Sequence, residues 1–174
     1  SMIGGKGLVV EIGEFFFFRQ KNGASKVLSD YWIFGGICRK TKECFLVQVS
    51  DRSAETLMPI IRQRIKPGSK IVSDHWQAYR DMSMSDFELQ TVKDQFSFIN
   101  PVGLGHTLQI EQLWNSLKQG NKQRQGTDWN YTDLYLTEFI WRTKLNGRDP
   151  FEAILQDISS FNCKVNKCFK FHMR

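Results

Sequence analysis

Apolar residues crowd the first third of the chain and recur at helical intervals in the rest. The runs LVVEIGEFFFFRQ (8–20), YWIFGGICRK (31–40) and ECFLVQVS (43–50) are rich in aromatic and β-branched residues, and polar turn residues separate them. They predict three strands joined in an antiparallel meander. The shorter runs KIVSD (70–74) and ELQTVK (88–93) predict two further strands.

Later segments place apolar residues three and four positions apart, which predicts helices over 51–65, 107–122, 133–145 and 149–158. In the second of these helices the apolar side consists of Ile110, Leu113, Trp114 and Leu117. The other side carries Leu108, Glu111, Asn115, Lys118 and Lys122. This order of elements predicts an α/β fold of the ribonuclease-H-like class, a five-stranded mixed sheet with helices on both faces.

Gly13 stands in the middle of the first predicted strand, where it weakens an otherwise strong strand pattern. In ribonuclease-H-like folds that act on phosphodiesters, a carboxylate from this place joins one from the end of the fourth strand and one from a later helix. Together they hold two divalent ions about 3.5–4 Å apart, and hard oxygen ligands suit Mg²⁺. Asp74 and Glu111 occupy the second and third places. The first place offers no side chain.

Seven stretches occur in the order and spacing of a known family. The chain resembles the DDE transposase domain of the Merlin superfamily and its related bacterial insertion sequences over residues 8–158. The stretches that carry this resemblance are VVEIGE, YWIFGGI, CFLVQVSDRSAETLMPII, PGSKIVSDHWQAY, GHTLQIEQLW, YLTEFIWR and DPFEAIL. The resemblance implies that the family's first catalytic aspartate, in a motif similar to E-I-D-E, falls on Gly13. The second aspartate then falls on Asp74 and the glutamate on Glu111.

The same resemblance places the family's His-Thr pair on His106 and Thr107. It also shows a second departure, because Leu108 stands where the family usually has an asparagine. Could another carboxylate replace the missing aspartate? Glu14 points to the opposite face of the strand, and Glu11, on the same face, is displaced by about 6–7 Å. We therefore interpret the two-metal site as broken.

The leading hypothesis is a host-domesticated, transposase-derived domain that is catalytically inactive and serves as a DNA-binding or protein-interaction module. It is expected to bind no cofactor; Mg²⁺ or Mn²⁺ would be the cofactor if the site still worked. One alternative is an active Mg²⁺-dependent DNA strand-transferase or nuclease that uses Asp74, Glu111 and a relocated Glu11. A second is a purely structural interaction module without nucleic acid. Taken alone, Asp74 could cap a helix, Glu111 could be a solvated carboxylate, and His106 could cap a helix or orient a phosphate.

The net charge of +6 and the sequence pI near 9.2 favour polyanionic partners, so DNA is the expected partner. A protein partner or a homo-oligomer is the other expectation. Lys118, Lys122 and Arg124 extend from the side of Glu111 and are candidates for phosphate contacts. A solvated basic helix end explains them equally well.

No run approaches the roughly 18 apolar residues of a membrane span, and no signal peptide is visible, so neither a membrane nor secretion is expected. The four cysteines favour a reducing compartment, the nucleus in a eukaryote and the cytoplasm otherwise. Cys163, Cys168 and His172 supply too few ligands for a zinc site.

Three segments are expected along the chain. Residues 1–7 form a lead-in, in which Ser1-Met2 is typical of a tag-cleavage scar and indicates a piece of a longer protein. Residues 8–158 form the transposase-derived domain, and residues 159–174 form a C-terminal extension.

Overall fold

The structure is a computed structural model that describes residues 1–22, 27–73, 87–91, 108–126 and 129–170. It divides into two compact units, Ser1–Thr137 and Glu138–Arg174. The first unit holds the sheet and two helices that pack on it. The predicted short lead-in contributes to this unit, because Ile3 is buried and bridges to Ile65.

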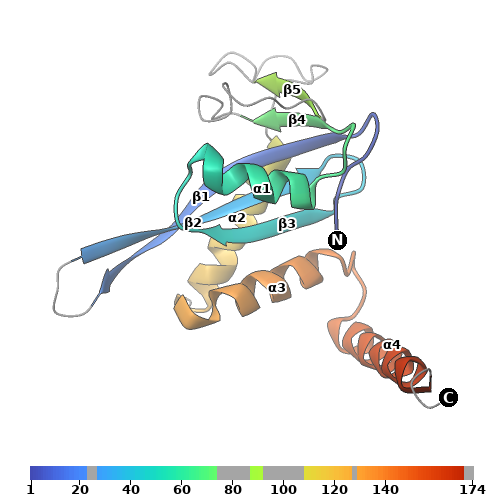
Figure 1. The fold of residues 1–174 in the computed structure, drawn as a ribbon. Helices are drawn as coiled ribbons and strands as arrows, with labels where there is room; N and C mark the ends of the chain where they lie inside the picture. The colour runs from blue at the N-terminus through green and yellow to red at the C-terminus, as the bar shows by residue number, and fades with distance from the viewer. Residues whose placement is uncertain (23–26, 74–86, 92–107, 127–128, 171–174) are drawn as a thin grey trace. The chain divides into compact units, whose positions relative to one another are not determined.

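The strands of the first unit form one mixed sheet with the order β3-β2-β1-β4-β5 (Figure 1). Their bounds are β1 Val9–Asn22, β2 Val27–Cys38, β3 Cys44–Val49, β4 Lys70–Ser73 and β5 Glu88–Thr91. β1, β2 and β3 pair in antiparallel fashion, whereas β4 pairs in parallel with both β1 and β5. The predicted meander and mixed sheet are confirmed.

The helices begin close to where the hydrophobic pattern places them. Their bounds are α1 Ala54–Arg64, α2 Leu108–Gln123, α3 Thr132–Thr143 and α4 Pro150–Lys170, with a short 3₁₀ helix over Trp129–Tyr131 before α3. Ser53 caps α1 as predicted, since its side chain accepts a hydrogen bond from the backbone N–H of Thr56.

Helices cover both faces of the sheet, and the alternation of residues along β1 decides which side chain meets which helix. Val10 and Ile12 are fully buried in the main apolar core, to which α1 contributes Leu57, Met58 and Ile61. The residues between and after them, Glu11 and Gly13, face α2 instead. The side of the sheet that should carry catalytic carboxylates is therefore the α2 side.

The second unit contains the end of α3 and the whole of α4. Asp149 caps α4 by accepting hydrogen bonds from the backbone N–H groups of Phe151 and Glu152, at 2.9 and 3.0 Å. The indole N–H of Trp141 donates to Asp157 of α4 at 2.7 Å. The last helix was predicted to end near residue 158, but it continues to Lys170. None of the helices in the described part of the chain is long and apolar enough to span a membrane.

Candidate functional site

Glu11 lies in the middle of β1, and its carboxylate is completely buried under the start of α2. Its Oε2 atom accepts hydrogen bonds from the backbone N–H groups of Gln109, at 2.8 Å, and Ile110, at 2.9 Å. Its Oε1 atom accepts one from Nε of Arg39 at 2.6 Å. Both carboxylate oxygens are therefore engaged in holding the protein together.

This arrangement satisfies three separate physical demands. The first N–H groups of a helix have no partner within the helix, and two of those of α2 find one in Glu11. The negative charge of Glu11 also lies at the positive end of the α2 dipole. Burial of a carboxylate is costly unless it is paired and hydrogen-bonded, and Arg39 supplies the pairing charge.

Gly13 lies two residues further along β1, on the same face as Glu11. A Cβ atom added there would lie 3.5 Å from Nε1 of Trp114 and 3.6 Å from Cγ1 of Ile110, which is ordinary van der Waals contact. The packing against α2 therefore leaves room for a Cβ atom at this position. Lack of space for a Cβ atom does not explain this glycine.

Gly35 is the residue of β2 opposite Gly13, and at this position lack of space does explain the glycine. Gly35 pairs with Gly13, and a Cβ atom at Gly35 would come within 2.6 Å of Cη2 of Trp114 and 2.8 Å of Cδ2 of Leu46. Trp114 also stacks on Phe15, with 5.4 Å between ring centroids. The indole ring of Trp114 thus leaves no space for a Cβ atom at Gly35 of β2, whereas it leaves enough space for one at Gly13 of β1.

Glu111 lies on the exposed side of α2, as the periodicity predicted. Ile110, Leu113, Trp114 and Leu117 are buried, while Leu108 and Glu111 are exposed. Leu108 leaves 47% of its surface accessible one turn before Glu111. An apolar side chain thus stands beside the predicted catalytic glutamate, in the place where the family pattern has an amide.

Asp74 and His106 lie outside the described residues, as does Thr107. The described part of β4 ends at Ser73, one residue before Asp74. Within the part of the chain whose side chains are described, no three aspartate, glutamate, histidine or cysteine residues gather as a metal site requires. The predicted meeting of Asp74 with Glu111 therefore stays a prediction.

The three basic candidates occupy the second half of α2 and the turn after it. Lys118, Lys122 and Arg124 are all exposed. Nζ of Lys118 lies 5.1 Å from the ring centroid of Phe15, and the guanidinium of Arg124 lies 4.6 Å from that of Tyr135. Lys118 shares the exposed side of α2 with Glu111, seven residues earlier.

The sequence pattern missed Arg39 and the capping role of Glu11. Arg39 follows β2, and the hairpin pairs Glu11 with Ile37, so the two charged residues stand diagonally across the strands. Opposite charges at such positions attract each other. The hairpin register would have revealed this pair, but the hydrogen bonds to α2 depend on a contact between residues nearly one hundred positions apart.

A family model described as an ISXO2-like transposase domain matches residues 14–144, well over half of the chain. The chain belongs to this DDE transposase family. The matched range includes Asp74, Glu111 and the three basic residues, and it begins one residue after Gly13.

The individual proteins that match this chain share little sequence identity with it. An uncharacterized transposase-like protein of Haemophilus influenzae is 27% identical over 104 residues, which cover 56% of this chain and 78% of that protein. A cryo-EM structure of a simian T-cell lymphotropic virus intasome in complex with PP2A regulatory subunit B56 gamma contains a chain that matches with a TM-score of 0.49 and 12% identity. That match covers 86% of this chain and about half, 52%, of the other.

Proposed function

We propose that this transposase-family chain is a domesticated, catalytically inactive domain with a ribonuclease-H-like fold that binds DNA without cleaving it. The fold assignment is supported by the antiparallel meander that continues into parallel strands, with helices on both faces of the sheet. One observation carries the loss of cleavage: β1 directs Glu11 and Gly13 toward the start of α2, where Gly13 has no side chain and both carboxylate oxygens of Glu11 already accept hydrogen bonds.

The residues of β1 do not fit the metal pair that DDE chemistry requires. Mg²⁺ or Mn²⁺ would need a carboxylate on this strand with oxygens directed at both ions. Gly13 has no side chain, and the oxygens of Glu11 already accept hydrogen bonds from Arg39 and from the backbone of α2. Releasing Glu11 to a metal would leave buried donors without partners, which is costly.

The first experiment measures cleavage. Supercoiled plasmid is incubated with the protein and Mg²⁺ or Mn²⁺, and conversion to nicked or linear DNA is followed against a Glu111→Gln variant. We expect both proteins to leave the plasmid intact. Metal-dependent nicking that disappears in Glu111→Gln would overturn the proposal in favour of an active nuclease or strand-transferase built on Asp74, Glu111 and another carboxylate.

The second experiment measures DNA binding. The proposed binding of DNA is supported by the net charge of +6 and by the basic residues along α2. Binding of a labelled DNA duplex is followed by fluorescence anisotropy at several salt concentrations, starting near ~50 mM, where phosphate contacts are strongest. A Lys118→Gln, Lys122→Gln, Arg124→Gln triple variant should weaken binding and lower the slope of log K against log salt by about 1 for each phosphate that is no longer neutralised.

A charge-matched control separates a specific surface from net charge alone. Lys6, Lys40 and Lys66 are exposed and lie elsewhere on the first unit. Changing these three to glutamine removes the same charge, so duplex binding should stay close to that of the wild type. Equal decreases in affinity for both triple variants would contradict a DNA-binding surface on α2, and no binding at all would favour a purely structural module.

A further inference from the structure

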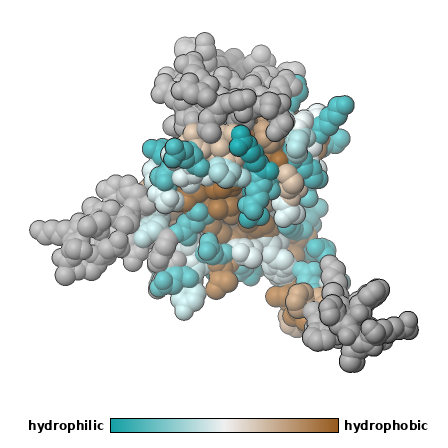
Figure 2. Space-filling model, viewed as in Figure 1, coloured by the Kyte–Doolittle hydropathy of each residue, from teal (hydrophilic) through white to brown (hydrophobic). Residues whose placement is uncertain are grey.

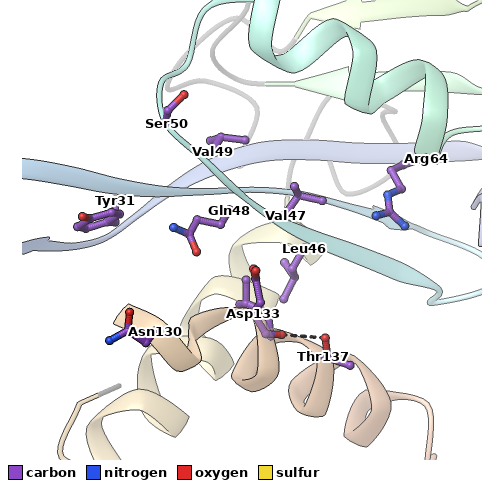
Figure 3. A pocket seen from close by; sticks show the side chains of 11 residues that line it. Tyr31, Leu46, Val47, Gln48, Val49, Ser50, Arg64, Asn130, Asp133 and Thr137 are labelled. Atoms are coloured by element: carbon purple, nitrogen blue, oxygen red, sulfur yellow. Dashed lines mark hydrogen bonds between the residues drawn. The ribbon is translucent and has the colours of Figure 1, made fainter. Parts of the chain in front are cut away.

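A groove of about 840 Å³ runs along β3 in the first unit (Figure 3). β3 contributes Leu46, Val47, Gln48 and Val49, and Ser50 continues the lining. The opposite wall includes Asp133, Leu136 and Thr137 of α3. Figure 3 shows Asp133 and Thr137 on the α3 side of the groove, facing β3. This volume is in the range of ordinary ligand-binding pockets.

The groove follows the edge of β3 rather than one face of the sheet. Successive residues of a strand point to opposite faces, so a surface lying on one face would be lined by every second residue. Here five consecutive residues contribute. β3 is also the outermost strand in the order of the sheet, and among the described residues β2 is the strand that pairs with it.

The sequence of β3 lacks the usual protection of an exposed edge. Edge strands commonly carry lysine, proline or other charged residues that prevent another chain from pairing with them. β3 reads CFLVQV and contains none of these. Figure 2 shows hydrophobic surface in the middle of the face that Figure 1 presents, bordered by hydrophilic surface. An apolar edge of this kind can accept an added strand.

Arg64 supplies a charged group to the same groove. It is the last residue of α1, and Figure 3 shows its side chain extending from the end of that helix toward β3. Its Nε atom is buried and has no hydrogen-bond partner. A buried donor without a partner is rare, and it costs free energy that a carboxylate in the groove would recover.

We propose that this groove binds an extended segment of a partner protein, which adds a strand to the outer edge of β3 and directs a carboxylate side chain to Arg64. The backbone of the segment pairs with β3, and its alternate side chains contact Leu46 on one face and Val47 on the other. Affinity then comes from backbone hydrogen bonds and selectivity from the acidic residue.

A second copy of this chain fits the groove less well than a single extended segment. Antiparallel pairing of two β3 strands would place both α3 helices on the same side of the joined sheet. Because α3 already forms the far wall of the groove, each helix would occupy the space along the other copy's edge. A single strand meets no such obstacle.

The test uses a displayed library of random peptides of about ten residues, the upper length of ordinary strands. The enriched peptides should alternate apolar and polar residues and share one aspartate or glutamate. Bound peptide should shift the backbone amide signals of β3 in NMR spectra. An Arg64→Gln variant should weaken binding by about tenfold or more, since a hydrogen bond to a charged group is removed.

Two further variants keep the result interpretable. Arg62→Gln removes an exposed charge from the same turn of α1 and should change the dissociation constant less than twofold. Thr137→Phe places a bulky ring at an exposed position of the far wall and should also weaken binding by tenfold or more. The proposal is overturned if no library peptide binds, if the selected peptides bind Arg64→Gln and wild type equally, or if the protein forms dimers that Thr137→Phe abolishes.

Discussion

The carboxylate of Glu11 on β1 accepts a hydrogen bond at 2.9 Å from the backbone N–H of Ile110, the third residue of α2 and the neighbour of Glu111. Through this bond and its companion at Gln109, the first strand sets the position of the helix that carries the predicted catalytic glutamate. Glu11 therefore caps the N-terminus of α2 from a position in β1.

Glu11→Gln should destabilise the protein by about 2–4 kcal/mol, because it removes the buried charge that pairs with Arg39 and satisfies the α2 terminus. The free energy of unfolding is measured by urea titration. Glu55→Gln is the matched control, since Glu55 is an exposed carboxylate in the first turn of α1 and should contribute only about 0.3–1 kcal/mol. A decrease in stability for Glu11→Gln no larger than that of the control would show that the capping bonds add little.

The composition of the apolar runs was enough to locate the strands, and helical spacing was enough to locate the buried side of α2, because both patterns are local in the sequence. The role of Glu11 could not be found in this way, since its partners at Gln109 and Ile110 come from a helix that docks only in the folded state. The end of α4 was missed for a local reason. Residues 159–170 are mostly polar, yet they contain no glycine or proline to stop the helix.

The two glycines of the β1–β2 pair should respond differently to alanine. Gly35→Ala forces a Cβ atom against Trp114, Leu46 and the backbone oxygen of Phe45, and should cost about 1–3 kcal/mol. Gly13→Ala meets only ordinary contacts and should be neutral, or stabilising by about 0.5–1 kcal/mol, because alanine loses less backbone entropy than glycine. Urea unfolding of both variants tests this, and a comparable destabilisation by Gly13→Ala would mean that α2 packs more closely on β1 than the structure shows.

Gly13→Asp should raise the affinity of the protein for Mn²⁺ above that of the wild type, because it places a carboxylate at the β1 position that faces α2. The structure leaves room for its Cβ atom beside Trp114 and Ile110. Isothermal titration calorimetry compares Gly13→Asp with Gly13→Asn, which has the same size but no charge. The variant should not gain full plasmid-cleavage activity, since Leu108 still stands beside Glu111. If Gly13→Asp takes up no more Mn²⁺ than Gly13→Asn, a carboxylate at this position does not create a metal site.

Asp51 should make stability depend on pH in the acidic range. Hydrogen bonds to its carboxylate from the side chain and backbone of Ser53, and from the hydroxyl of Thr56, hold the pKa of Asp51 far below its usual value. A carboxyl group with a lowered pKa in the folded state stabilises the protein above its unfolded pKa of about 4, and this contribution is lost as the pH falls toward the folded value. Asp51→Asn should therefore lower the denaturant midpoint by a constant amount between pH 7 and pH 5, and the difference from wild type should shrink below about pH 4. If the difference in denaturant midpoint between Asp51→Asn and wild type stays unchanged down to pH 3, the charge of Asp51 does not contribute to stability, and the hydrogen-bond geometry alone accounts for the effect.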